Sequence, residues 1–404
     1  MECGQPPSST QNGIFEKLNK NQEKPMSTAA SITVAGAGFA AITGVRELRK
    51  QLPDAEITLV APRPEFVYLP SLIWVPYGLR KGEDLVFDIL PLLKKLKVKY
   101  VQGSVSGVSE DGRTLQTTAG EIENDALLIA TGSRYIKKLP GIENVITICE
   151  GVAAAEKMRD RLQAMDGGTI AMGFGGNPKE PSAMRGGPMF ELLFGLETWL
   201  NQQGIREKFR LVFFTPAPQP GKRLGEKAVV KLLEELKKRG IETHLGNKLK
   251  SFENNVVQTE GGEIPADLIL FMPGMTGPAW MQGTPLPASP GGMIQADAMA
   301  RVEGMERVYV AGDAGSFPGP DWMPKQAHMA DLQATSAAKN IALNLAGKPA
   351  ADKFKVELLC IIDSLDKGML VYRGEKRGFA LPSMRSLHWA KRYFEKTYLR
   401  HFRI

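Results

Sequence analysis

Two short segments far apart in the chain have the composition of two parts of one nucleotide-binding fold. VAGAGFAA at Val34–Ala41 has the form of a strand that runs into a glycine-rich turn, and VYVAGDA at Val308–Ala314 has the form of a later strand of the same sheet. A chain that leaves such a sheet and returns to it much later has inserted another domain between the two parts. We therefore predict an α/β protein with two Rossmann-like dinucleotide-binding domains.

The apolar pattern predicts two rounds of alternating strand and helix, which favours parallel sheets. The first round has strands at 31–35, 56–60, 97–101 and 126–130, a helix that ends at residue 50, and a turn region at 121–122. The second has strands at 169–174, 210–214, 242–245 and 267–271, with helices at 189–202 and 225–239. The chain then returns with a strand at 307–311 and a helix at 326–345. Short strands at 358–362 and 368–372 and a basic, aromatic helix complete it.

These elements predict the domain boundaries. The first dinucleotide-binding domain consists of residues 27–145 and 286–350, and residues 146–285 form the second domain between them. Residues 351–404 form a C-terminal region with a cysteine and a membrane-attachment segment. Residues 1–26 are polar and are expected to be a disordered tail.

The bulk composition of the 404 residues is that of a globular protein, with 43% hydrophobic and 24% charged residues. No run of apolar residues is long enough to cross a bilayer, and no apolar segment near the start predicts a signal peptide. Three cysteines are too few for a disulfide scaffold, and no metal site is predicted.

The first glycine-rich turn has the pattern of a pyrophosphate-binding loop. Gly36, Gly38 and Ala41 fit the spacing GxGxxA, with Phe39 and Ala40 between them. The first glycine makes the tight turn, the second allows close approach of a pyrophosphate, and the small third residue lets the helix pack on the strand. On its own, the pattern also fits an ordinary glycine-rich turn.

Two later segments favour FAD as the bound dinucleotide. DALLIATGSR at Asp125–Arg134 resembles the ATG turn of two-domain flavoproteins and makes Thr131 and Gly132 candidate contacts. The segment VYVAGDA places Gly312 and Asp313 where such flavoproteins hold the ribityl chain of the flavin.

Other parts depart from the dinucleotide pattern. The strand LVAPRP carries no acid for the adenosine ribose, so Arg63 or the backbone must make that contact. The second glycine-rich segment, Gly173–Ala183, contains Pro178 and Pro181 and does not lead directly into a helix. The strand after it also lacks an acid. These departures argue against NADH as the electron donor.

Two cysteines are candidate redox groups. Cys149 precedes a helix that is predicted to start at about Glu150, a position that lowers a thiol pKa, and Cys360 lies in the strand segment ELLCIID. Taken alone, each is equally well explained as a small buried apolar residue. Cys3 lies in the polar tail.

The order of these motifs resembles the sulfide:quinone oxidoreductases. VAGAGFAA, ATGSR, Cys149, GFGG, YVAGDA, PKQAH, Cys360 and HWAKRYFEKTYL follow one another over residues 30–404. The nucleotide motifs are shared with type II NADH dehydrogenases and flavocytochrome c sulfide dehydrogenases. Many family members have a third cysteine, where this chain has Met184 or Arg185. The chain thus resembles the two-cysteine subtypes, close to the flavocytochrome c flavoprotein.

The resemblance implies a mechanism and site residues. Hydrosulfide attacks a disulfide or polysulfide bridge between Cys149 and Cys360, and Cys360 is the better candidate for the flavin-facing thiol. Sulfur leaves as polysulfide, and the electrons pass to ubiquinone or menaquinone. Lys325 and Gln326 lie near the flavin pyrimidine, although a solvated lysine at a helix start is an equal alternative. Leu359 and Phe379 are candidate quinone contacts.

The C-terminal segment predicts attachment to a membrane surface. Residues 385–404 hold six Lys or Arg and one Glu. A helical wheel gives a charged side and a largely apolar side, with Lys391 intruding: Arg385, Arg392, Glu395, Lys396, Arg400 and Arg403 lie on the first, and Leu387, Ala390, Tyr393, Phe394, Tyr398 and Phe402 on the second. We expect a peripheral protein on the cytoplasmic membrane, with its side left open, and no nucleic-acid binding. Docking of this helix on its own domain or on a second copy in a homo-oligomer is the alternative.

Two other functions fit parts of the pattern. A type II NADH:quinone dehydrogenase requires a helix-leading second glycine turn followed by an acid. A membrane-associated flavin redox sensor without turnover would keep FAD and both cysteines.

Overall fold

The computed structural model describes Met1 and residues 29–402, so the predicted tail at 1–26 and Cys3 lie outside the described residues. The first half has strands β1 (Ser31–Ala35), β2 (Glu56–Ala61), β3 (Glu65–Val67), β4 (Val86–Asp88), β5 (Val98–Gln102), β6 (Val105–Val108), β7 (Thr114–Thr117), β8 (Gly120–Glu123), β9 (Ala126–Ile129) and β10 (Arg134–Tyr135). Its helices are α1 (Phe39–Gln51), α2 (Leu90–Lys95) and α3 (Val152–Gln163).

The middle of the chain continues the alternation. Its strands are β11 (Gly168–Phe174), β12 (Phe209–Thr215), β13 (Glu242–Leu245), β14 (Leu249–Ser251), β15 (Val256–Thr259), β16 (Gly262–Pro265), β17 (Leu268–Met272) and β18 (Met275–Thr276). Its helices are α4 (Gly187–Gln202) and α5 (Glu226–Lys238). The last part contains β19 (Ile294–Gln295), β20 (Val308–Val310), β21 (Gly315–Ser316), α6 (Ala327–Leu345), β22 (Glu357–Asp363), β23 (Gly368–Gly374), β24 (Gly378–Ala380) and α7 (Arg385–Leu399).

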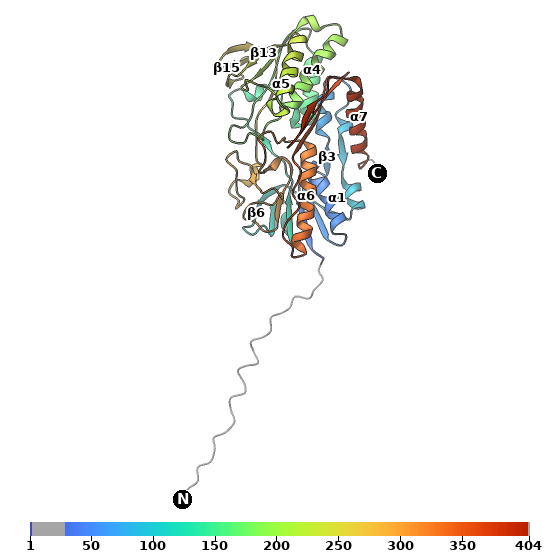
Figure 1. The fold of residues 1–404 in the computed structure, drawn as a ribbon, viewed down its shortest axis with the longest axis vertical. Helices are drawn as coiled ribbons and strands as arrows, with labels where there is room; N and C mark the ends of the chain where they lie inside the picture. Colours follow the sequence, from blue (N-terminus) through green and yellow to red (C-terminus); the bar gives the residue numbers. More distant parts are fainter. Residues whose placement is uncertain (2–28, 403–404) are drawn as a thin grey trace.

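The first sheet is parallel and has the order β20-β9-β1-β2-β5, so the late strand β20 does return to the sheet that β1 begins. Its strands are short apolar runs buried on both faces, as expected when helices and a small sheet cover a parallel sheet. Helices α1 and α6 lie side by side along one face (Figure 1). The two segments that opened the sequence argument are therefore neighbours in space.

The second sheet, β13-β12-β11-β17, is also parallel and lies at the other end of the elongated body, with α4 and α5 beside it (Figure 1). Helix α5 buries its apolar stripe, which includes Leu232 and Leu236, in the same cluster as Leu211 and Phe213 of β12. This pattern repeats the first domain and confirms the predicted α/β class.

Small antiparallel sheets cover the remaining sheet faces. Strands β6, β7 and β8 form one, and β14, β15 and β16 form another. The prediction of a turn region at residues 121–122 was wrong, because these residues lie in β8, where Ile122 pairs with Leu115 of β7. This strand is hard to recognise from sequence, because exposed glutamates flank Ile122, its single partly buried residue.

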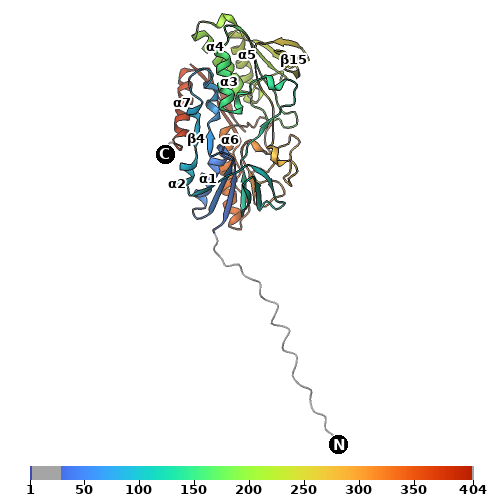
Figure 2. The same cartoon turned by 180° about the vertical axis from the view of Figure 1, so that it is seen from behind.

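The C-terminal region packs between the two parallel sheets and along one side of the molecule. It has three antiparallel strands, β22-β23-β24, where two were predicted. Helix α7 follows and lies beside β3 and β4, as both views show (Figures 1 and 2). No helix among residues 29–402 is long and apolar enough to cross a membrane.

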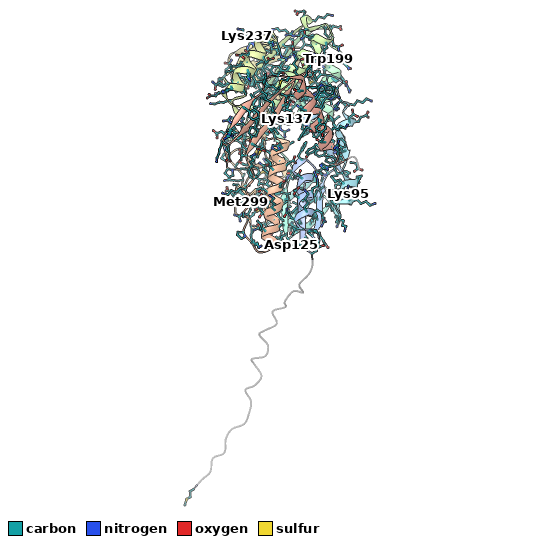
Figure 3. The ribbon with its side chains drawn as sticks, turned by 45° about the vertical axis from the view of Figure 1, so that its right-hand side comes forward. Lys95, Asp125, Lys137, Trp199, Lys237 and Met299 are labelled. Atoms are coloured by element: carbon teal, nitrogen blue, oxygen red, sulfur yellow. The ribbon has the colours of Figure 1, made fainter. Side chains whose placement is uncertain are left out.

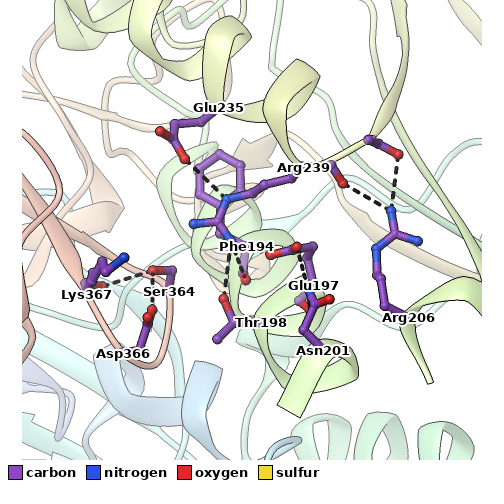
Figure 4. A network of polar contacts seen from close by, with 11 residues as sticks. Phe194, Glu197, Thr198, Asn201, Arg206, Glu235, Arg239, Ser364, Asp366 and Lys367 are labelled. Carbon is purple, nitrogen blue, oxygen red and sulfur yellow. Dashed lines mark hydrogen bonds and ion pairs between the residues drawn. The ribbon is translucent and has the colours of Figure 1, made fainter. Parts of the chain in front are cut away.

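A polar network ties the helices of the second domain together. Arg239, directly after α5, donates to Thr198 of α4 at 3.2 Å, pairs with Glu197 and lies over the ring of Phe194 at 5.0 Å (Figure 4). Asp125 lies at the opposite end of the body from Lys237 and Trp199 (Figure 3). There its carboxylate accepts from the Ser31 backbone N–H at 2.9 Å, which joins the starts of β1 and β9.

Candidate active site

The turn after β1 has a backbone that only glycine tolerates. Gly36 has a φ of +122°, and a Cβ there would lie 2.3 Å from the carbonyl oxygen of Ala130. Gly38 is the N-cap of α1, and a Cβ there would meet no atom within 4 Å. No side chain caps this helix start, and no acid lies in its first turn. The turn therefore leaves open space in front of free N–H groups, as an anionic phosphate requires.

The carboxyl ends of neighbouring strands complete the same edge of the sheet. Gly132 follows β9 with a φ of +72° and open space around its Cβ position. The Thr131 hydroxyl accepts from Trp280 Nε1 at 3.2 Å. After β20, the Gly312 N–H donates to the Gln333 side chain at 2.9 Å and positions Asp313. Phe39, Ala40 and Ala41 are buried under the turn and form its packing surface.

Asp313, Lys325 and Gln326 line one pocket at this edge, together with Ser182 and Phe317. Lys325 is buried, and its ammonium group donates to the Gly315 carbonyl and lies 5.7 Å from the Phe317 ring centroid. The alternative of a solvated lysine at a helix start is therefore wrong. Burial lowers the pKa of Lys325 to about 8, while the carboxylate of Asp313 opposes this shift.

The residues at this edge fit a flavin dinucleotide. The glycine turn offers a cradle that a Cβ would disturb, and the buried side-chain oxygen of Gln326 has no hydrogen-bond partner among the described residues. An orphaned buried acceptor next to a buried cation is the kind of group that a bound flavin ring would satisfy. Arg63 lies just after β2, and its Nε is 3.5 Å from Glu65. Because its side chain is exposed, it is accessible to a bound dinucleotide.

Cys149 lies in a short 3₁₀ turn, Ile148–Glu150, rather than at the start of an α-helix. Helix α3 begins only at Val152, because Gly151 has a φ of +131° and breaks the chain direction. The prediction of a lowered pKa was wrong: burial raises the pKa of the Cys149 thiol, and the nearby Arg185 guanidinium and Tyr135 hydroxyl oppose the rise. Burial of this thiol is the largest of these effects.

Cys360 lies in the middle of β22, paired with Val371 of β23. Burial raises the pKa of its thiol to about 12, the Glu191 carboxylate adds to the rise, and the Lys391 ammonium opposes it. Both cysteines are free thiols, so the structure contains no disulfide between them. Both pack against the same apolar cluster, together with Met184.

The segment 185–187 lies between the two thiols. Arg185 lies close enough to Cys149 to affect its pKa, and a Cβ added at Gly187 would be 4.0 Å from the sulfur of Cys360. The structure thus brings both predicted cysteines to one short stretch of chain before α4. Arg185 itself forms an ion pair with Asp313, which links the thiol side to the flavin side. Sequence reasoning noted Arg185 only as a departure from the family pattern.

The sequence also did not predict a group of buried ionisable side chains near Cys360. The Lys391 ammonium of α7 donates to both carboxylate oxygens of Glu191 on α4, at 2.8 and 2.7 Å, and to the Ile361 carbonyl at 3.2 Å. Asp363 lies 2.7 Å from His388 Nδ1 and accepts from Trp74 Nε1 at 3.0 Å. Burial raises the pKa of Glu191 to about 7, and Lys391 opposes this shift.

The two faces of α7 differ from the predicted ones. Glu395 is buried and accepts from Arg80 at 3.1 and 2.5 Å, while Phe402, just beyond α7, stacks on Phe66 at 4.4 Å. The helix therefore docks on its own chain through Lys391, Glu395 and Leu399. Large apolar side chains face outward at and near this helix: Leu359, Phe379, Leu381, Met384, Trp389, Tyr393 and Phe394. We call these seven residues the apolar rim.

The second glycine-rich segment departs from the pattern of a dinucleotide-binding turn. Helix α4 begins only at Gly187, after a loop of residues 175–186. Asn177 holds this loop by donating to the carbonyls of Met275 and Gly291 at 3.0 and 2.9 Å. The end of β11 is thus followed by a loop of residues 175–186, whereas the dinucleotide pattern leads directly from the strand into the helix.

Comparisons with known proteins agree with this geometry. Residues 30–334 match the family model described as pyridine nucleotide-disulphide oxidoreductase. The chain is 27% identical to a sulfide-quinone reductase of Aquifex aeolicus over 83% of this chain and 81% of that protein. It is 22% identical to a type II NADH:quinone oxidoreductase of Staphylococcus saprophyticus, over 86% of this chain and 92% of the relative. The crystal structure of the Aquifex aeolicus sulfide:quinone oxidoreductase superimposes with a TM-score of 0.83 at 26% identity, over 93% and 92% of the two chains.

Proposed function

Because this chain belongs to the pyridine nucleotide-disulphide oxidoreductase family, we propose that it is a sulfide:quinone oxidoreductase that oxidises hydrogen sulfide and reduces a quinone. The observation that carries the proposal is that two free thiols approach the same segment, which is linked by Arg185 and Asp313 to a flavin-type pocket. The fold and sequence likeness to a sulfide-quinone reductase points to the same chemistry.

The enzyme is an FAD-dependent oxidoreductase. Gly36, Gly38 and the N-terminus of α1 would hold the pyrophosphate, and Thr131, Gly132, Gly312 and Asp313 would line the path to the flavin. Bound FAD supplies a two-electron carrier between the sulfur donor and the quinone. Lys325 places a cation in the same pocket, and Gln326 offers an acceptor that has no partner among residues 29–402. Arg63 is the candidate for the adenosine end.

The thiols do the sulfur chemistry. Hydrosulfide attacks a sulfur bridge between Cys149 and Cys360, so that one cysteine keeps the added sulfur as a persulfide and the other is released as a thiolate. We assign Cys360 to the flavin-facing role by likeness to the sulfide:quinone oxidoreductases, and the buried pair Glu191 and Lys391 near it can hold or move a proton. Oxidised sulfur accumulates over turnovers and leaves as polysulfide.

The apolar rim indicates where the quinone and the membrane would bind. Leu359 is next to Cys360 in β22 and is 45% exposed, and Phe379 in β24 is 51% exposed. Exposed aromatic side chains beside Arg385, Lys396 and Arg400 suit the interface of an anionic bilayer. We therefore propose a peripheral protein on the cytoplasmic membrane that takes ubiquinone or menaquinone through this rim.

The strand order supports the proposed domain division. All strands of the first parallel sheet come from 27–145 and 286–350, and all strands of the second come from 146–285. Residues 351–404 contribute β22–β24 and α7, which carry Cys360 and most of the rim.

Reduction of a soluble quinone analogue by the holoenzyme tests the function. With sulfide as the donor we expect turnover that needs both cysteines, and with NADH we expect none, because the second glycine-rich segment lacks the pattern of a nicotinamide dinucleotide site. Turnover with NADH alone would favour the type II dehydrogenase, to which the chain is also related. A flavin-bearing protein without turnover from either donor would favour a redox sensor.

A further inference from the structure

Arg185 is a buried cation in the centre of the proposed site that the sulfur chemistry has not yet used. It lies between the loop after β11 and the start of α4, and its guanidinium pairs with Asp313 while the side chains remain only 18% and 13% exposed. Burial lowers the pKa of this guanidinium, but the charges of Asp313, Tyr135 and Cys149 outweigh that effect and raise it. Arg185 therefore stays charged in a place where water cannot screen it.

Tyr135 brings a second donor to the same place. Its strand β10 pairs with β18, Tyr135 opposite Met275, and the Met275 N–H donates to the Ala183 carbonyl at 3.0 Å. Two residues of chain then lead from Ala183 to Arg185. The Tyr135 hydroxyl is buried and has no hydrogen-bond partner among the described residues. A buried hydroxyl without a partner destabilises a fold, so its presence here points to a group that it serves during function.

The Cys149 thiol is the group that both donors face. Tyr135, Arg185 and Cys149 lie close enough for each to affect the pKa of the others. The other charged groups around Cys149 are Glu191, which disfavours a thiolate, and Glu150, which is paired with Lys137 at 2.5 Å. Arg185 is thus the cation that offsets the cost of placing a negative sulfur in this buried site.

We propose that Arg185 and Tyr135 form an anion-binding site for the sulfur of Cys149, and that the ion pair with Asp313 positions the guanidinium. The site takes a soft, singly charged sulfur anion: the Cys149 thiolate or the terminal sulfur of a persulfide on Cys149. It deepens the proposed sulfide oxidation, on which it rests, because that reaction needs such an anion in a buried place. Arg185 is a positioning residue, since it acts through Cys149.

Alkylation of the holoenzyme by iodoacetamide across a pH series, followed by peptide mass analysis, tests this site. The measured quantity is the midpoint pH at which Cys149 becomes reactive. Arg185→Gln should move the midpoint up by about one pH unit or more, because an opposite charge at this range shifts a pKa by that amount. Arg185→Lys should restore most of the wild-type midpoint, since it keeps the charge.

Tyr135→Phe is the variant that should keep the fold, because it removes a single oxygen atom that has no hydrogen-bond partner in the part of the chain that the structure describes. It should move the midpoint up by less than Arg185→Gln does. Lys179→Gln is the matched control: it removes one exposed positive charge from the same loop and should leave the midpoint in place. A midpoint that does not move in Tyr135→Phe, or that moves equally in Lys179→Gln, overturns the anion site.

Sulfide-dependent quinone reduction by the wild-type enzyme is measured in parallel. If the wild type shows no such turnover, the proposed function fails whatever the midpoints are. If it turns over and the midpoints do not depend on Tyr135 or Arg185, only the anion site fails.

Discussion

Lys391 of α7 donates two hydrogen bonds, of 2.8 and 2.7 Å, to the carboxylate of Glu191 on α4. This pair joins the C-terminal helix to the second domain and lies near Cys360, and both of its charges influence the pKa of the Cys360 thiol. The surface helix and the buried thiol are thereby coupled. The coupling makes the charge state of the pair a determinant of Cys360 reactivity.

The two partners of this pair should affect Cys360 in opposite directions. Glu191→Gln removes a negative charge and should lower the midpoint pH for Cys360 alkylation at pH values above about 7, where Glu191 is ionised. Lys391→Met removes the opposing positive charge and should raise the midpoint. The measurement is alkylation against pH, and the double variant, in which no buried charge is left unpaired, should fall between them. Shifts of the same sign in both single variants would contradict the coupling.

Replacing each of the two glycines of the first turn by alanine should affect FAD affinity and thermal stability differently. Gly38→Ala adds a Cβ to open space at a φ of −83°, so the protein should fold with an unchanged melting temperature but lose at least about tenfold in FAD affinity. Gly36→Ala should lower the melting temperature as well, because its Cβ would meet Ala130. Flavin content and thermal unfolding separate the two effects. Full flavin loading of Gly38→Ala would reject the phosphate cradle.

The apolar rim should control binding to lipid vesicles. Replacing Trp389, Tyr393 and Phe394 by Ser should weaken binding to anionic vesicles by about a hundredfold or more, since burial of each large apolar side chain contributes roughly 1.5–3 kcal/mol. The three side chains are 62%, 65% and 56% exposed, so the fold should not suffer. Vesicle co-sedimentation measures the effect. Val230→Ser on α5, which is also 56% exposed, is the control, and an equal loss there would show that the rim has no special role.

Local backbone chemistry made the first sheet predictable. Strand β1 has the predicted bounds. The tight turn after it was predicted from Gly36, whose positive φ is a conformation that glycine adopts readily. Lys325 could be placed at the start of α6, but its burial depends on Phe317 and Gly315, which no local pattern reveals.

The thiol environments were harder to predict because they depend on long-range packing. A helix starting at Glu150 is reasonable from composition, yet Gly151 delays it and burial then sets the pKa of Cys149. The helical wheel gave no role for Lys391 within the apolar face, because its partner Glu191 is 200 residues away in the sequence. An isolated charge on an otherwise apolar face is the signal that could have predicted a buried ion pair.

Anaerobic addition of sulfide to the FAD-loaded enzyme tests the central claim most directly, with the visible absorption band of the flavin as the readout. The account predicts that sulfide rapidly bleaches this band in the wild type, that NADH does not, and that Cys360→Ser keeps FAD but is not bleached by sulfide. Bleaching by NADH alone, or equal bleaching by sulfide in Cys360→Ser, would contradict it.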